Sequence, residues 1–287
     1  MCELFCLSSR RPTRATFSLR RFAAHGAPGT ANVDGWGVAF HDGRDLRLYK
    51  EPEPAGDSPW LTFIEQQSLP TRLLISHIRR ATCGGNSHAN TQPFARELGG
   101  RMHLFAHNGT LPEIAAQDPA PGARFQAVGE TDSERAFCLL LERVAPLWQG
   151  ASVPSLAARR AAVETFAAQM RPLGTANFLY SDGDVVFAHG HRRTQADGRL
   201  TAPGLWVRHR HRTPPAGTES HASGVVLHTA DHSAGHAPDH FHAGAPQEMA
   251  LLASVPVTAE NWRPLAEGEI VVVSAGELVS DSQLASA

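Results

Sequence analysis

The chain has 287 residues, of which 42% are hydrophobic and 19% charged, and its formal net charge is -2. A chain of this length can bury a sizeable core, and so small a net charge provides no global field that would attract nucleic acid or anionic lipid. No stretch reaches the roughly 18 consecutive apolar residues that predict a membrane span, so we expect neither a nucleic acid nor a membrane as partner.

The N-terminus predicts a short buried strand over residues 3–7, preceded by a cysteine. Once the initiator methionine is removed, Cys2 becomes the first residue and its thiol lies beside a free α-amine. That amine titrates near pH 7.7 to 8.0, so it can accept the proton of a thiol of pKa about 8.5 without a separate histidine. Cys2 is therefore a candidate nucleophile, although an early cysteine beside a strand is more often a small core residue.

The N-terminal region lacks the apolar core of a signal peptide, because an arginine-rich stretch follows only a few apolar residues. The cysteines show neither CxxC pairs nor the density of a disulfide scaffold, and these features together predict a cytoplasmic protein. The four cysteines are Cys2, Cys6, Cys83 and Cys138.

Strands and helices are mixed along the chain without regular βαβ alternation, which favours an α+β fold. A helix is expected over residues 17–24, closed by Gly26, and Asp42-Gly43 predicts a hairpin turn. Apolar residues at i, i+3, i+4 and i+7 predict two further helices, over residues 131–144 and 156–170. The first predicted strands cover residues 3–7, 38–40, 46–49, 73–77 and 103–106.

The C-terminal half is rich in predicted strands, and no linker or internal repeat divides the chain. We therefore expect residues 1–287 to form a single domain. Its least ordered part is a loop region around residues 209–242, which contains eight histidines. Spacing of i, i+4 from His228 to His240 could hold a transition metal on a helix, but Gly235 and Pro238 oppose a helix there. A solvated loop without a metal is the preferred interpretation.

Residues 76–94, SHIRRATCGGNSHANTQPF, run from a predicted buried strand into a loop rich in Gly and Asn. Arg79 follows the apolar stretch LLISHI directly, at a position where binding residues are commonly presented. Paired arginines more often form a solvated edge. A guanidinium at the end of a buried strand, however, is suited to two-pronged binding of a carboxylate.

Another predicted strand ends in His107-Asn108-Gly109. Asn-Gly commonly forms a hairpin turn. Alternatively, the Asn108 side-chain amide and the Gly109 N–H could form an oxyanion hole, in which each donor lowers the barrier by roughly 2.7 to 4 kcal/mol.

The stretch GETDSERAF, which follows, has the spacing of a capping box between Thr131 and Glu134, at the start of the predicted helix. Such a cap would leave the carboxylate of Asp132 free. That carboxylate could bind a substrate ammonium.

In this order along the chain, these features resemble the class II glutamine amidotransferases, the N-terminal-nucleophile hydrolases whose mature chain begins with cysteine. The resemblance covers most of the chain. Within the family, the chain is most similar to the stand-alone members, a branch that includes a γ-glutamyl hydrolase of ergothioneine synthesis. The resemblance implies a four-layer αββα sandwich. The strings that carry it are MCELF, DGWGVAF, HIRRAT, AHNGTL and GETDSERAF, with SVPVTAENWRPLAEGEIVVV near the end.

The resemblance also implies roles for individual residues. Cys2 would be the nucleophile and its own α-amine the base, while Asn108 and Gly109 would form the oxyanion hole. Arg79 would bind the α-carboxylate of glutamine and Asp132 its α-ammonium. No cofactor and no metal are implied.

The loop after Arg79 departs from the pattern of many ammonia-channelling synthases. Those enzymes have the sequence Trp-Ala-Thr-His at this place, whereas this chain has Arg80-Ala81-Thr82-Cys83. Thr82 is expected to line the substrate loop. Because that Trp helps to couple hydrolysis to a second active site, its replacement puts channelling in doubt. No acceptor domain is evident in the sequence either.

We therefore expect an amidohydrolase that cleaves the γ-amide of glutamine or of a γ-glutamyl compound, its small-molecule substrate, through a γ-glutamyl-thioester. One alternative is a glutaminase subunit that supplies ammonia to a separate synthase. Another is a non-catalytic glutamine-binding regulatory protein, but such a protein would be expected to lose the cysteine or the Asn-Gly pair.

Overall fold

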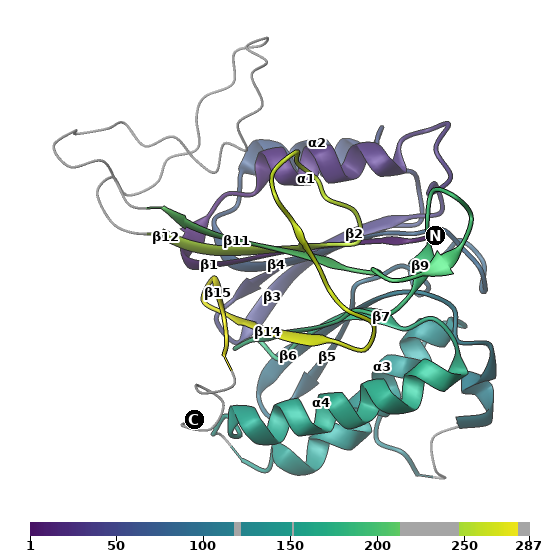
Figure 1. Ribbon diagram of the computed structural model, residues 1–287, viewed down its shortest axis with the longest axis vertical. Coiled ribbons are helices and arrows are strands. Elements are labelled where there is room, and N and C mark those ends of the chain that lie inside the picture. The colour runs from purple at the N-terminus through teal and green to yellow at the C-terminus, as the bar shows by residue number, and fades with distance from the viewer. Residues whose placement is uncertain (118–121, 151, 213–246, 281–287) are drawn as a thin grey trace, which may run out of the picture.

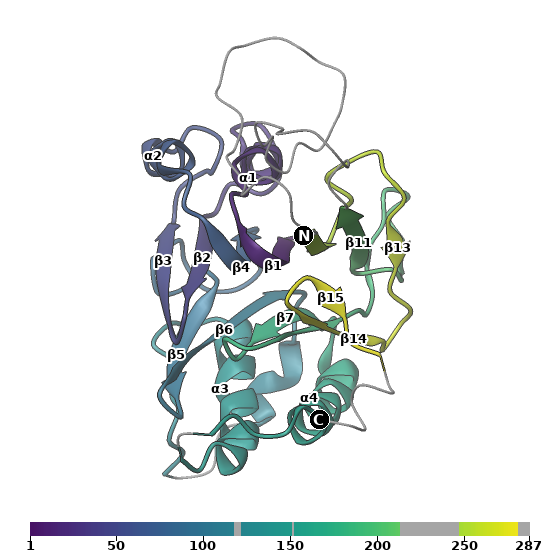
Figure 2. The same ribbon diagram turned by 90° about the vertical axis from the view of Figure 1, so that its left-hand side faces the viewer.

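The structure is a computed structural model that describes residues 1–117, 122–150, 152–212 and 247–280. Two antiparallel sheets lie face to face between two layers of helices (Figures 1 and 2). Helices α1 (Thr16–Ala23) and α2 (Pro59–Gln67) cover the first sheet, and α3 (Asp132–Val144) and α4 (Leu156–Met170) cover the second. The predicted α+β class and the αββα order of layers are confirmed.

The first sheet has seven strands in the order β13-β11-β12-β1-β4-β2-β3. The strand that begins beside Cys2 is therefore central, with β12 on one side and β4 on the other. The strands are β1 (Glu3–Thr13), β2 (Trp36–Asp42), β3 (Asp45–Glu51), β4 (Thr71–Ile78), β11 (Trp206–Arg212), β12 (Gln247–Ala253) and β13 (Arg263–Pro264).

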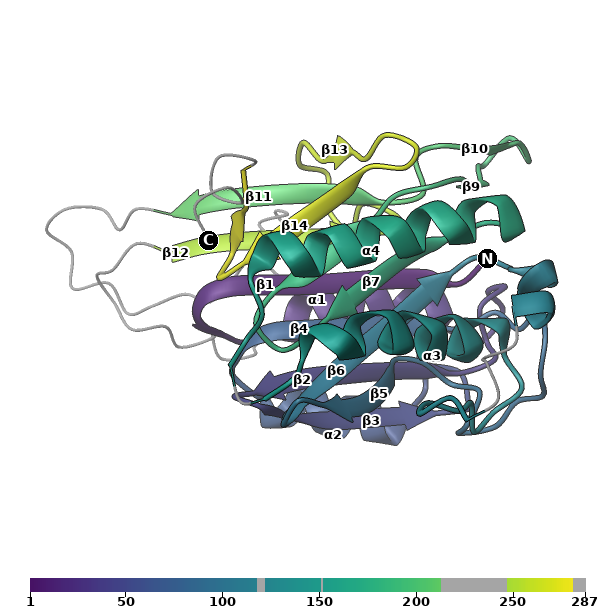
Figure 3. The same cartoon turned by 90° about the horizontal axis from the view of Figure 1, so that it is seen from below.

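The second sheet has six strands in the order β15-β14-β8-β7-β6-β5. Helices α3 and α4 run side by side across its outer face (Figure 3). Its strands are β5 (Phe94–Leu98), β6 (Arg101–Asn108), β7 (Asn177–Ser181), β8 (Val186–His189), β14 (Ile270–Ser274) and β15 (Glu277–Leu278). The remaining short elements are β9 (Arg193–Thr194), β10 (Leu200–Thr201) and the 3-10 helices Ala24–Gly26, Pro112–Gln117, Ala145–Leu147 and Arg171–Leu173.

Three apolar layers hold the sandwich together, and β1 contributes to two of them. Because successive side chains of a strand point to opposite faces, Phe5 and Leu7 pack toward α1 and α2, whereas Leu4 and Cys6 pack between the sheets. The third layer lies between the second sheet and α3 and α4, and it is rich in phenylalanine.

Helix α4 has the predicted bounds, and α3 begins one residue later than predicted because Thr131 is its N-cap. The Thr131 hydroxyl accepts a hydrogen bond from the Glu134 N–H at 3.2 Å, as predicted. The second bond of the predicted capping box, from the Thr131 N–H to the Glu134 carboxylate, is wrong, however. The Glu134 carboxylate instead accepts from the Gly129 N–H at 2.7 Å and pairs with Arg96 at 2.5 Å.

Helix α2 and strand β5 are among the elements that were not predicted, although the sequence carries their signals. The Ser58 hydroxyl caps α2 by accepting from the Leu61 N–H at 3.1 Å, and Pro59 begins the helix. Gly99 and Gly100, both with positive φ, form the tight turn between β5 and β6. The predicted Asp42-Gly43 hairpin is confirmed by the pairing of β2 with β3.

The start of the predicted histidine-rich loop is a strand. His209 and His211 lie in β11, which pairs with β12, and both rings contact the Glu248 carboxylate on that neighbouring strand. Local composition predicted a loop here because the strand depends on pairing with β12, which lies far away in the sequence. The remainder of that predicted loop, residues 213–242, lies outside the described residues. In the described ranges, no helix has the length and apolar character needed to cross a bilayer.

Candidate active site

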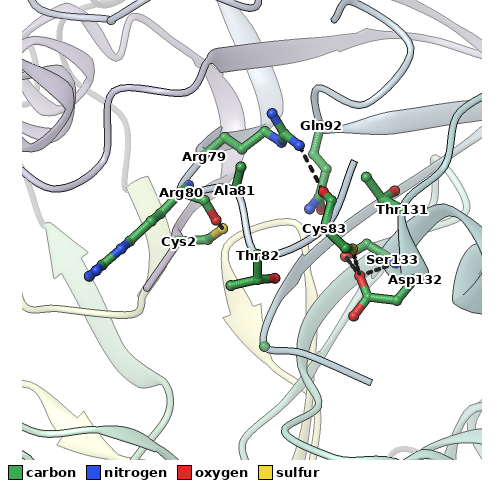
Figure 4. Close-up of a pocket in the computed structure, with 11 residues that line it drawn as sticks. Cys2, Arg79, Arg80, Ala81, Thr82, Cys83, Gln92, Thr131, Asp132 and Ser133 are labelled. Atoms are coloured by element: carbon green, nitrogen blue, oxygen red, sulfur yellow. Dashed lines mark hydrogen bonds between the residues drawn. The ribbon is translucent and has the colours of Figure 1, made fainter. Parts of the chain in front are cut away.

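A cavity opens at one end of the sandwich, where β1 begins and β4 ends (Figure 4). It combines the N-terminus, the loop after β4, the residue after β6 and the start of α3. Such convergence of chain segments at strand and helix ends is typical of small-molecule sites. The lining residues are Cys2, Arg79, Arg80, Ala81, Thr82, Cys83, Gln92, Gly109, Thr131, Asp132 and Ser133.

The structure brings together the predicted site residues Cys2, Arg79, Thr82, Gly109 and Asp132 around this cavity. The sixth, Asn108, is fully buried and comes directly before Gly109 at the end of β6. Their placement is consistent with a shared site, and their individual roles stay predictions.

The Cys2 thiol lies against the backbone of Arg80. Its Sγ accepts from the Arg80 N–H at 3.2 Å and is also 3.2 Å from the Arg80 carbonyl, to which the thiol can donate. Burial raises the pKa of the Cys2 thiol, while the hydrogen bond from Arg80 and the charge of the chain terminus act to lower it. A thiol of raised pKa is protonated at neutral pH and needs a base to become a nucleophile.

The α-amine of Met1 lies beside this thiol in the unprocessed chain. Burial lowers the pKa of that amine, and the positive charges of Arg80 and Arg193 lower it further. An amine of lowered pKa is more often unprotonated at neutral pH, the form in which it can accept a proton. Removal of Met1 would transfer the free amine to Cys2 itself.

Arg79 is 3% exposed, and its guanidinium is already bonded within the loop. Nη1 donates to the Asp34 carbonyl at 3.3 Å and to Asn86 Oδ1 at 3.0 Å. Nη2 donates to the carbonyls of Cys83 and Gly84 at 3.1 and 3.2 Å. Arg79 thus organises the loop, and binding of a carboxylate by its Nη groups would exchange some of these contacts.

Asp34 completes the organisation of this loop, a role that the sequence reading of DGWGVAF missed. Its Oδ2 accepts from the Ala81 N–H at 2.8 Å, and its Oδ1 accepts from Asn86 Nδ2 at 3.2 Å. The available signal was an acidic residue in a Gly-rich turn, which predicts only the turn. Its hydrogen-bond partners lie far along the chain.

Asp132 is the first residue of α3, and the expectation that its carboxylate is free is wrong. Oδ2 accepts from the Leu111 N–H at 2.7 Å and Oδ1 from the Ser133 N–H at 2.7 Å, because the unpaired N–H groups of the helix start and the preceding loop point at it. Cys83 Sγ lies 3.5 Å from Oδ1. The Ser133 hydroxyl also lies 3.2 Å from Oδ1, so three of these contacts fall on Oδ1 and one on Oδ2. Each carboxylate oxygen has about two acceptor sites, so Oδ2 retains capacity for a ligand ammonium.

Asn108-Gly109 does not form a hairpin turn. Strand β6 pairs with β7, in which Asn177 lies opposite Asn108, and the intervening chain includes α3 and α4. A Cβ on Gly109 would lie 1.9 Å from the Thr175 carbonyl oxygen, so the close approach of two backbones requires glycine here. The Asn108 side-chain Nδ2 donates to Ser254 Oγ at 3.0 Å.

Gln92 and His107, which sequence reasoning did not assign, support the same strand end. The Gln92 side-chain amide accepts from the His107 N–H at 2.6 Å and donates to the His107 carbonyl at 3.2 Å. Burial lowers the pKa of the His107 imidazole, which is therefore neutral. Its Nε2 donates to the Thr175 carbonyl at 2.9 Å, so Nδ1 accepts from the Ser133 hydroxyl at 2.8 Å.

Within the part of the chain that the structure describes, no group of three or more His, Cys, Asp or Glu side chains is arranged to hold a metal ion. The chemistry available at the cavity comes from a thiol, an amine, a carboxylate, a guanidinium and backbone N–H groups. Groups of these kinds can together perform acyl transfer.

Comparison with known proteins agrees with this set. The sequence model of the family described as glutamine amidotransferases class-II matches residues 1–286. The YafJ protein of Escherichia coli (strain K12) is 35% identical over 189 residues, which are 66% of this chain and 72% of YafJ. The protein MJ1515 of Methanocaldococcus jannaschii is 26% identical over 283 residues, 97% of this chain and 71% of MJ1515.

Solved structures show the same relationship. The crystal structure of a predicted glutamine amidotransferase from Pseudomonas aeruginosa PA01 has a TM-score of 0.66 and 28% identity, and the match covers 98% of this chain and all of that one. Glutamine phosphoribosylpyrophosphate amidotransferase from B. subtilis shares the fold, with a TM-score of 0.57 and 16% identity over 98% of this chain, which corresponds to 49% of that enzyme. The chain therefore belongs to the class II glutamine amidotransferases.

Proposed function

We propose that this protein hydrolyses the γ-amide bond of glutamine or of a γ-glutamyl compound, with Cys2 as the nucleophile. The observation that carries the proposal is the cavity that Cys2 lines together with the start of α3 and the residue after β6. A terminal thiol, backbone donors and a carboxylate in one cavity suit acyl transfer from a substrate that carries an ammonium group.

The reaction begins after removal of Met1, when the α-amine of Cys2 is free. The amine takes the proton of the thiol, and Sγ attacks the γ-carbonyl carbon. The side-chain amide of Asn108 and the N–H of Gly109 stabilise the oxyanion. The tetrahedral intermediate collapses as the ammonium returns its proton to the leaving nitrogen, giving a thioester. Water, deprotonated by the same amine, then releases glutamate and regenerates the thiol.

Recognition of the glutamyl part would fall to the loop and to α3. Asp132 would accept hydrogen bonds from the α-ammonium, and Thr82 would line the pocket beside it. Arg79 would bind the α-carboxylate after exchanging part of its contacts with the loop carbonyls. These contacts fix the α-groups of the substrate and leave the γ-amide at Cys2.

The leaving side of the cavity favours a γ-glutamyl compound with an acidic leaving group. Arg80 lines the cavity where channelling synthases carry Trp, and its side chain is exposed. A cation at the rim can attract a carboxylate on the departing amine. We further propose that the activity resides in a single cytoplasmic domain spanning residues 1–287. The alternatives are an ammonia-supplying subunit for a separate synthase and a non-catalytic glutamine-binding protein.

The test starts with a mass spectrum of the purified protein, which shows whether Met1 is absent. Glutamate release is then measured from glutamine and from a panel of γ-glutamyl amides, with Cys2→Ala as the blank. We expect a higher kcat/KM for γ-glutamyl conjugates with acidic leaving groups than for glutamine. Preference for glutamine, or activity only after a second protein is added, would support the ammonia-supplying alternative. No release from any substrate by Met1-free protein would contradict hydrolysis altogether.

A further inference from the structure

We propose that Ser254 is a positioning residue that sets the orientation of the Asn108 amide relative to the strand that carries Cys2. The inference rests on the proposed function, because it concerns the oxyanion hole of the same reaction. Ser254 directly follows β12, is fully buried and is not among the described residues that line the cavity.

The Ser254 hydroxyl joins the two sheets at the site. Its Oγ accepts from the Leu4 N–H of β1 at 3.1 Å and from Asn108 Nδ2 of β6 at 3.0 Å. Leu4 lies two residues after Cys2 and belongs to the first sheet, whereas Asn108 ends a strand of the second sheet. One oxygen atom therefore links the start of the nucleophile strand to the oxyanion-hole side chain.

The backbone of Ser254 explains why the hydroxyl is in this place. The Ser254 N–H donates to the Leu4 carbonyl at 3.0 Å, which continues the pairing of β12 with β1 by one residue. The return bond from the Leu4 N–H goes to the hydroxyl, while the Ser254 carbonyl accepts from Arg193 Nη1 at 2.5 Å. The hydroxyl thus replaces a backbone acceptor at the end of the strand and reaches the second sheet.

Asn108 depends on this contact. Its carbonyl is held by Asn177 Nδ2 at 3.0 Å, but its side-chain Oδ1 is buried with no hydrogen-bond partner in the described ranges. A buried amide oxygen without a partner is unfavourable. A half-turn of the amide would bring Oδ1 onto the Ser254 proton and turn both Nδ2 hydrogens to the opposite side. The Ser254 hydroxyl can donate as well as accept, so it can hold the amide in this second orientation, which satisfies Oδ1 and releases Nδ2 for an oxyanion.

Loss of the hydroxyl should therefore reduce transition-state stabilisation more than substrate binding. Removal of a whole oxyanion-hole donor costs about 10²- to 10³-fold in kcat. Misorientation of the donor should cost less, so we expect Ser254→Ala to lower kcat by about 10- to 100-fold with KM nearly unchanged. Ser8→Ala is the matched control. Ser8 lies in β1, further from Cys2, and like Ser254 it is buried. Its hydroxyl also accepts a hydrogen bond from a backbone N–H, that of Gly276, at 3.0 Å.

The decisive experiment is a double-mutant cycle on Met1-free protein with Ser254→Ala, Asn108→Ala and the double variant. If Ser254 acts through Asn108, the double variant should be no slower than Asn108→Ala alone. Multiplied losses, or an unchanged kcat for Ser254→Ala with an active wild type, would overturn the inference and leave the proposed function intact. Absence of glutamate release by the wild type would overturn both.

Alkylation of Cys2 by iodoacetamide provides a second measurement, because that reaction forms no oxyanion. Its rate should be the same in Ser254→Ala, Ser8→Ala and the wild type. A slower rate in Ser254→Ala alone would mean that the hydroxyl serves the nucleophile strand through Leu4 and not the amide of Asn108, which would overturn the inference.

Discussion

Strand β6 carries two buried histidines on one face, His103 near its start and His107 near its end, and their surroundings differ. His103 Nδ1 lies 2.8 Å from the Tyr180 hydroxyl and its Nε2 lies 3.1 Å from the Leu98 carbonyl. His107 contacts the Ser133 hydroxyl and the Thr175 carbonyl. Burial lowers the pKa of both imidazoles, that of His103 to about 4.

The hydrogen-bond partners of the two histidines differ in whether they line the cavity. Tyr180 is fully buried, and the same end of the sandwich contains the buried ion pair between Arg159 and Asp182. Ser133, by contrast, lines the cavity, and the backbone of His107 is held by Gln92, which also lines it. Burial and hydrogen bonding of both ring nitrogens are therefore common to the two histidines, and His107 differs in that its partner Ser133 lines the cavity. We call the end of the sandwich at His107 the cavity end and the end at His103 the closed end.

The largest expected effect separates the two ends by chemistry. Cys2→Ala should lower glutamate release by about 10⁴-fold or more, because the variant removes the thiol that is proposed to form the thioester. The melting temperature should change little, since Cys2 lies at the chain terminus. Protein that retains Met1 should be equally inactive, because the nitrogen of Cys2 then forms the peptide bond to Met1 and cannot act as the base.

A glutamine-analogue electrophile, followed by peptide mass mapping, checks the assignment of the nucleophile. The label should be on Cys2, with Cys6, Cys83 and Cys138 as internal controls. A label on one of those cysteines while Cys2 stays unmodified would show that the nucleophile is misassigned.

At the closed end, Arg159→Ala should reduce stability and leave the chemistry unchanged. Arg159 is 5% exposed and Asp182 0%, and their side chains are 2.8 Å apart, so the variant leaves a buried carboxylate without its cation. We expect the free energy of unfolding in urea to fall by about 3 to 5 kcal/mol. Arg160→Ala, which removes the more exposed i,i+4 pair with Glu164, should have a smaller effect, because such a pair is worth about 0.5 kcal/mol or less. A lowered kcat in the folded fraction of Arg159→Ala would mean that the two ends are coupled.

A smaller effect on substrate binding is expected from Asp132→Asn at the cavity end. Removal of one charge-assisted contact with the α-ammonium is worth about 1.5 to 3 kcal/mol, which corresponds to a KM raised about 10- to 100-fold. Asp184→Asn at the closed end, where Asp184 pairs with Arg159 at 2.9 Å, is the control and should leave KM unchanged. Equal KM values for the two variants would place the ammonium site elsewhere.

The smallest effect concerns the pH dependence at the cavity end. In the unprocessed chain, the Arg80 charge is, after burial, the main cause of the lowered pKa of the Met1 amine. We expect the same charge to lower the pKa of the Cys2 amine once Met1 is removed, because the Arg80 backbone contacts the Cys2 thiol. Arg80→Gln should raise that pKa, so the unprotonated base would be lost at a higher pH and the acid limb of kcat/KM should shift upward. The shift should shrink with added salt, because exposed charges are screened. The matched variant Arg199→Gln, at an exposed arginine paired only loosely with Asp197, should leave the limb in place. A downward shift in Arg80→Gln would show that the amine is not the titrating base.

Much of the molecule could be predicted from local sequence. The periodic apolar residues of α3 and α4 identify those helices, because each helix buries one face against a sheet and repeats that face every 3.6 residues. The Asp42-Gly43 turn fixes a hairpin in the same local way. Cys2 and the ordered motifs around Arg79, Asn108 and Asp132 were identified because their residue types and order, not their spatial positions, carry the information.

Only the tertiary structure decided how these groups are used. The sequence shows that Arg79 and Asp132 have charges suited to a substrate, but not that loop carbonyls already occupy the guanidinium or that backbone N–H groups hold the carboxylate. Local composition predicted that His209 lies in a loop, because the strand forms only by pairing with β12, whose residues are about 40 positions away. The link from Ser254 to Leu4 and Asn108 spans 250 and 146 positions. Local periodicity determines which face of an element is buried, whereas contacts at such separations depend on how the two sheets are stacked, and that stacking creates the cavity.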